Sequence, residues 1–151
     1  MNENSNTAAG HEAAGKKVIT NYNLIILDRS GSMSSIRKYA VDAVNETIAS
    51  MRARQQAHEA DEKSMVTLVA FCSCSLQVIY NNVPVEEAKP LTLKDYRPCC
   101  CTPLYDAIGN NITRLHDMVG DDKNTTVQVT IITDGYENSS REFSHKAIKS
   151  L

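Results

Sequence analysis

The chain has 151 residues, with 16 Lys and Arg against 18 Asp and Glu and a formal net charge of −2. This length suits one domain with a buried core, and the balanced charge with few aromatic residues gives no basis for nucleic-acid binding. No apolar stretch approaches the roughly 18 residues of a membrane span. Residues 1–15 lack the apolar core of a secretory signal, so we expect a cytoplasmic protein that binds neither nucleic acid nor membrane.

The N-terminal half predicts a polar tail, a strand and a helix. Residues 1–16 are poor in apolar side chains and predict a disordered tail, and residues 17–151 predict one α/β domain. The run Val18–Leu27 ends in consecutive apolar residues, as in a central strand buried on both faces. We expect a helix to begin near Ser34 or Ser35, either of which could cap it. Its apolar residues recur every three or four positions: Ile36, Ala40, Ala43, Val44, Ile48 and Met51.

The second half predicts a hairpin, a helix, a strand and the start of another helix. Met65–Phe71 and Leu76–Tyr80 are short apolar runs close in sequence, which predicts an antiparallel pair. Asn81–Pro98 contains three prolines and predicts an irregular connection. Thr125–Thr133 is rich in Val, Ile and Thr and predicts a strand, and a further helix would begin near Arg141. Between the irregular connection and this strand, apolar residues at helical spacing predict a second long helix that ends at a glycine: Leu104, Ile108, Ile112, Leu115, Val119 and Gly120.

This alternation of strands and helices predicts an open, doubly wound α/β sheet of the Rossmann-like kind. Ligands of such sheets bind outside the carboxyl ends of the strands. Asp28 follows the first strand and Asp134 follows the fourth, so both should open onto the same edge. Further ligand groups are therefore expected at the ends of neighbouring elements.

Oxygen-bearing side chains occur in three segments that should converge on this edge. The first strand is followed by Asp28, Ser30 and Ser32, with Thr102 before the second long helix and Asp134 after the fourth strand. Carboxylates and hydroxyls suit a hard cation such as Mg²⁺. Each segment alone is a weak signal, because Asp, Ser and Thr are ordinary in turns and helix caps.

Taken together, Asp-x-Ser-x-Ser, Thr-Pro-Leu-Tyr-Asp and Thr-Asp-Gly resemble the metal-ion-dependent adhesion site (MIDAS) of von Willebrand factor type A (VWA) domains. The resemblance implies that Ser30, Ser32 and Thr102 ligate the metal through their hydroxyls. Asp28 and Asp134 would lie in or near its coordination sphere, often acting through water. It also implies a bacterial-type binding module rather than an enzyme, in which Mg²⁺, with Mn²⁺ or Ca²⁺ as alternatives, captures a Glu or Asp carboxylate of a partner protein.

The same resemblance implies a mostly parallel sheet with one antiparallel edge strand. VWA domains usually have six strands in the order 3-2-1-4-5-6, whereas four are found here, in the order 3-2-1-4. We expect the domain to be truncated before strands five and six. Strand four would then be an exposed apolar edge, and either the chain is a fragment or another chain covers that edge.

Two other interpretations remain open. A hydrolase or phosphatase would use Ser30 or Asp28, although the chain has neither a Gly-x-Ser-x-Gly elbow nor a phosphate-binding glycine loop. A soft-metal or redox site would use the cysteines, which are odd in number and lack Cys-x₂-Cys spacing. They lie in two groups beside the predicted metal edge: Cys72 and Cys74, then Cys99, Cys100 and Cys101.

Overall fold

A computed structural model describes residues 18–73, 75–99, 101 and 103–134 of the chain. Its elements, in chain order, are β1 (Ile19–Asp28), the 3₁₀ helix η1 (Gly31–Ile36), α2 (Arg37–Ala57), β2 (Glu62–Cys72), β3 (Ser75–Pro84), the 3₁₀ helix η2 (Val85–Glu87), α3 (Leu104–Val119) and β4 (Thr125–Ile132). The predicted tail (residues 1–16) and the predicted helix near residue 141 lie outside the described residues.

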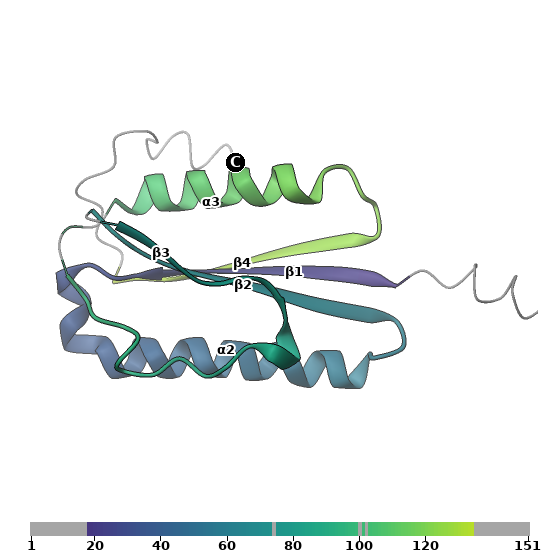
Figure 1. Ribbon diagram of the computed structural model, residues 1–151, viewed down its shortest axis with the longest axis horizontal. Helices are drawn as coiled ribbons and strands as arrows, with labels where there is room; N and C mark the ends of the chain where they lie inside the picture. Colours follow the sequence, from purple (N-terminus) through teal and green to yellow (C-terminus); the bar gives the residue numbers. More distant parts are fainter. Residues whose placement is uncertain (1–17, 74, 100, 102, 135–151) are drawn as a thin grey trace, which may run out of the picture.

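The sheet has the predicted order and strand directions. Its order is β3-β2-β1-β4, with β1 parallel to both β2 and β4, and β3 antiparallel to β2. Helix α2 covers one face and α3 covers the other, so that the sheet is the middle of three layers (Figure 1). The predicted α/β, Rossmann-like architecture is therefore confirmed for the four described strands.

The alternation of side chains along β1 explains why this strand is central. Ile25 and Leu27 belong to the core beneath α2, whereas Leu24 and Ile26 belong to the core beneath α3. All four are almost completely buried, as the continuous apolar run predicted for a strand covered on both faces. The described sheet ends at β4, where Val127 and Ile131 are 49% and 39% exposed.

Two predicted boundaries are wrong. The first long helix begins at Arg37, after the separate turn η1, and no side chain caps it; Ser35 instead donates to the Ser32 carbonyl at 3.3 Å. Strand β3 continues to Pro84, inside the segment predicted to be irregular. It can do so because Asn82 adopts a left-handed backbone conformation, with φ of 52°, beside a shift in the β2–β3 register.

Candidate metal site at the carboxyl edge of the sheet

Asp28, the last residue of β1, is completely buried, and its carboxylate joins two strand ends. Oδ1 accepts the Ser30 backbone N–H at 2.8 Å, and Oδ2 accepts the Thr133 hydroxyl at 2.8 Å. A buried carboxylate is costly unless it accepts such hydrogen bonds. The pairing therefore holds the turn after β1 against the residues that follow β4.

The two predicted hydroxyl ligands of this turn lie side by side. The Oγ atoms of Ser30 and Ser32 are 3.1 Å apart, and the Met33 backbone N–H donates to the Ser30 carbonyl at 3.0 Å where η1 begins. Neighbouring ligands in an octahedron with bonds of about 2.1 Å are separated by about 3.0 Å. The hydroxyl spacing therefore fits two adjacent ligands of one Mg²⁺ ion, and Ser32, which is exposed, places that position near solvent.

The structure brings Asp134 to the same edge, whereas Thr102 lies outside the described residues. Asp134 comes two residues after β4 and is half-buried. Thr133, the residue before Asp134, donates its hydroxyl to the Asp28 carboxylate at 2.8 Å, which holds the end of β4 against the end of β1. Of the five predicted ligands, Asp28, Ser30, Ser32 and Asp134 therefore gather at one edge.

Tyr96 is a part of this edge that the sequence did not reveal. Its hydroxyl donates to the Asp28 backbone carbonyl, and its side chain is completely buried. Burial, followed by the charges of Asp28 and Asp134, raises the pKa of the Tyr96 phenol far above its ordinary value. Arg37 anchors the same residue by donating to its carbonyl at 2.8 Å. Tyr96 lies in a non-periodic segment, so no pattern signalled its position.

Two of the five cysteines meet beside the turn. The Sγ atoms of Cys72, at the end of β2, and Cys99, in the segment before α3, are 3.4 Å apart. Arg29 donates from Nη2 to Cys72 Sγ at 3.4 Å, and its carbonyl accepts the Cys99 backbone N–H at 2.7 Å. The hydrogen bond with Cys72, and then burial, raise the pKa of the Cys99 thiol. Cys101 lies close by, exposed, and Cys74 and Cys100 are outside the described residues.

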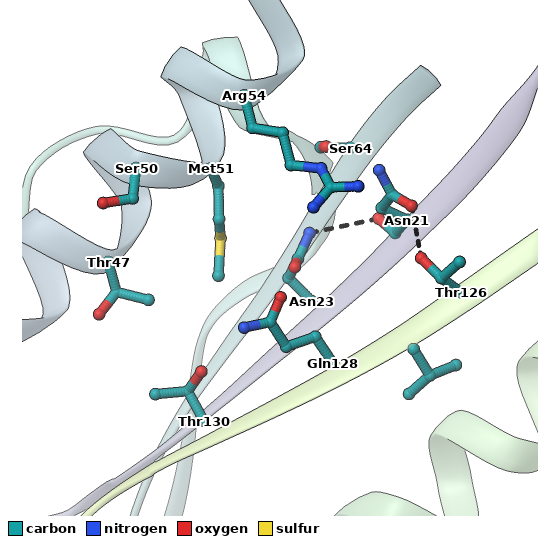
Figure 2. A pocket seen from close by; sticks show the side chains of 11 residues that line it. Asn21, Asn23, Thr47, Ser50, Met51, Arg54, Ser64, Thr126, Gln128 and Thr130 are labelled. Atoms are coloured by element: carbon teal, nitrogen blue, oxygen red, sulfur yellow. Dashed lines mark hydrogen bonds between the residues drawn. The ribbon is translucent and has the colours of Figure 1, made fainter. Parts of the chain in front are cut away.

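A second polar region lies at the other end of the strands, between α2 and the β1–β4 side of the sheet. It is a cleft of about 700 Å³ lined mainly by amides and hydroxyls, and Figure 2 shows Asn21, Asn23 and Gln128 on the sheet facing Met51 and Arg54 on α2. No pattern in the sequence had indicated a cleft at this end of the strands. The feature of the sequence that corresponds to it is the pair of asparagines that precede the apolar run of β1.

The part of the chain that the structure describes contains no group of three or more His, Cys, Asp or Glu side chains that could hold a metal ion. The predicted site relies instead on hydroxyls, which such a group does not include. Comparison with protein-family models finds no match, and comparison with curated proteins finds none either. The same described part contains no helix that is long and apolar enough to cross a membrane.

Proposed function

We propose that the chain is a VWA-like module that binds a divalent metal at the carboxyl edge of its sheet and uses it to capture a carboxylate of a partner protein. The observation that carries this proposal is the pair of Ser30 and Ser32 hydroxyls, 3.1 Å apart, beside the buried carboxylate of Asp28. Mg²⁺ is the ion proposed first, with Mn²⁺ or Ca²⁺ as alternatives. Ser30, Ser32 and Thr102 are the proposed hydroxyl ligands, and Asp28 and Asp134 would lie in or near the coordination sphere.

The hydrogen bonds of Asp28 support different roles for the carboxylate and the hydroxyls in metal binding. Both of its carboxylate oxygens already accept protein donors, from Ser30 and Thr133. The carboxylate therefore supplies negative charge close to the cation and fixes the direction of the turn, while the hydroxyls supply direct ligands. Such supporting hydrogen bonds orient metal ligands in other proteins.

The charge of this ligand set favours an anionic partner. Hydroxyl ligands are neutral, so a bound divalent ion would keep much of its positive charge and attract one more negative oxygen. Mg²⁺ commonly retains water in its coordination sphere, and a Glu or Asp side chain could replace such a water. Because Ser32 is exposed, the partner would approach from that side.

The surroundings of Ser30 support binding rather than catalysis. Within the described residues the Ser30 hydroxyl makes a hydrogen bond with the Ser32 hydroxyl, which is not a base that could activate a nucleophile. The two histidines within the described residues, His58 and His116, belong to the far ends of α2 and α3. Those ends adjoin the beginnings of the parallel strands, opposite the edge that carries Asp28.

Isothermal titration with Mg²⁺ and Mn²⁺ tests the metal site. We expect Ser30→Ala to weaken metal binding at least tenfold, because it removes a direct ligand while leaving the backbone N–H that donates to Asp28. Ser34→Ala is the matched control, since Ser34 is exposed in η1 and is not a proposed ligand. Equal affinities for Ser30→Ala and the wild-type chain, with both folded by circular dichroism, would contradict the proposal.

A capture experiment tests the partner. The immobilised chain is incubated with cell extract in Mg²⁺, and bound proteins are then eluted with EDTA. We expect a partner that EDTA releases, that Ser30→Ala fails to retain and that Ser34→Ala retains. A partner that stays bound in EDTA, or that binds all three proteins equally, would argue against capture through the metal.

A further inference from the structure

We propose that Cys72 and Cys99 form a reversible disulfide that controls the candidate metal site. Their sulfurs are 3.4 Å apart although the residues are 27 positions apart in the chain. A disulfide bond is about 2.0 Å long, so the sulfurs need to approach by about 1.4 Å. The cross-link would join the end of β2 to the segment before α3.

The contacts of the pair favour this reaction over other pairings of described cysteines. Arg29 donates to Cys72 Sγ at 3.4 Å, and a neighbouring guanidinium stabilises the thiolate form that reacts with oxidants. Cys72 is 5% exposed, whereas Cys99 is only half-buried, so a small oxidant can approach from the Cys99 side. The hydrogen bond with Cys72 raises the pKa of the Cys99 thiol. Cys72, beside the guanidinium, is therefore the proposed nucleophile, and the half-buried Cys99 supplies the second thiol and the access.

A hydroperoxide is the oxidant class that we propose. One thiolate attacks the peroxide, the O–O bond breaks, and the products are a sulfenic acid and hydroxide, which takes up the proton lost by that thiol. The second thiol then attacks the sulfenic sulfur, so that the S–S bond forms and water leaves. Two electrons pass from the sulfurs to the peroxide, giving two waters for each hydrogen peroxide. A dithiol reductant reverses the change by thiol–disulfide exchange.

The position of the two cysteines links the disulfide to the metal site. This control of metal binding rests on the function proposed above. The backbone N–H of Cys99 donates to the carbonyl of Arg29 at 2.7 Å, and Arg29 lies between Asp28 and Ser30. On the other side, Cys99 precedes the proposed ligand Thr102 by three residues. Drawing Cys99 towards β2 would pull on the Arg29 carbonyl and shift the turn that carries Asp28 and Ser30, and we expect oxidation to weaken metal binding about tenfold, since a shift of about 1 Å is enough to disrupt a preorganised site.

Two matched variants test the cross-link. The first keeps Cys72 and Cys99 and carries Cys74→Ser, Cys100→Ser and Cys101→Ser. The second keeps Cys72 and the exposed Cys101 and carries Cys74→Ser, Cys99→Ser and Cys100→Ser. After brief treatment with hydrogen peroxide, we expect the first to lose two hydrogen atoms in its intact mass and to resist maleimide, and dithiothreitol to reverse both changes.

The second variant should form an intramolecular cross-link at least tenfold more slowly. Equal rates for the two variants, or no cross-link in the first while circular dichroism shows it folded, would overturn the proposed pairing. In the wild-type chain, Cys99→Ser should abolish the fast phase of cross-linking, and Cys101→Ser should leave it unchanged.

Metal titration of the first variant, reduced and oxidised, separates the two proposals. Weaker Mg²⁺ binding after oxidation, restored by reduction, supports control of the site. Equal affinities in the two states overturn the control while leaving the disulfide intact. Failure of the reduced protein to bind Mg²⁺ or Mn²⁺ would instead overturn the proposed metal function, whatever the cross-linking result.

Discussion

Strand β1 carries polar side chains at both of its ends, but their surroundings differ. At the carboxyl end, the charged Asp28 is completely buried and both of its oxygens accept hydrogen bonds from nearby donors. At the other end, the neutral Asn21 and Asn23 line an open cleft of about 700 Å³. Asn23 donates to the Met65 carbonyl at 3.0 Å, and Asn21 pairs with side chains on β2 and β4.

The difference follows from the cost of burying charge. An ionised carboxylate removed from water needs close donors on its oxygens, which requires tight packing of the strand ends around it. Asn21 and Asn23 are also buried, at 7% and 6% exposed, but a neutral amide costs less to bury than a charge, and each makes hydrogen bonds to its neighbours. We therefore expect the carboxyl edge to be sensitive to single substitutions and the cleft to be tolerant.

Asp28→Ala should produce the largest effect. It leaves the Ser30 N–H and the Thr133 hydroxyl without their buried acceptor, and we expect a loss of about 3 kcal/mol in the free energy of unfolding. Urea denaturation in EDTA measures this loss without a contribution from bound metal. Asp42→Ala, at an exposed position on α2, should change stability by less than about 0.5 kcal/mol. Similar stabilities of the two variants would contradict the contrast between the regions.

Tyr96→Phe should have an intermediate effect. It removes the hydroxyl that donates to the Asp28 carbonyl while keeping the buried ring, and we expect a loss of about 1–2 kcal/mol. Tyr39→Phe is the control, because Tyr39 is 77% exposed. The raised pKa of Tyr96 also predicts that this phenol ionises last in an alkaline absorbance titration. If the variant Tyr96→Phe instead lacks a tyrosine that ionises early in the titration of the wild-type chain, the Tyr96 phenol is not buried beside the two carboxylates.

The smallest effect should come from the ion pair beside the cleft. A hydrogen bond from Arg54, and then one from Asn21, lower the pKa of Glu62. A carboxyl whose pKa is lower in the folded state stabilises the fold above its unfolded pKa of about 4, and this contribution is lost as pH falls through the folded value. Glu62→Gln should therefore show less acid-dependent loss of stability than the wild-type chain.

Urea midpoints at pH about 6 and about 3 would measure that difference, because they lie on either side of the ordinary carboxyl pKa. Glu46→Gln, at an exposed position of α2, should retain the acid dependence of the wild-type chain. If Glu62→Gln and Glu46→Gln respond equally to acid, the ion pair does not contribute to the fold in the predicted direction.

Much of the architecture could be predicted because its signal is local. The apolar run of β1 indicated burial on both faces, and the spacing of apolar residues after Leu104 located α3 correctly. The boundaries of α2 and β3 were wrong because a 3₁₀ turn and a bulge depend on backbone hydrogen bonds that leave no periodic pattern. Sequence order also predicted that Asp28 and Asp134 would share an edge.

The sequence by itself determined the alternation of strands and helices, the two covered faces and the oxygen-bearing turn after β1, because local periodicity constrains them; the strand order was what the resemblance to VWA domains implied. Only the tertiary structure decided which groups meet at that turn. Tyr96 reaches the Asp28 carbonyl, and Cys99 reaches Cys72, from an irregular segment whose path is set by contacts with distant residues. The cleft likewise depends on the spacing between α2 and β4, which arises from packing between elements rather than from any pattern within one of them.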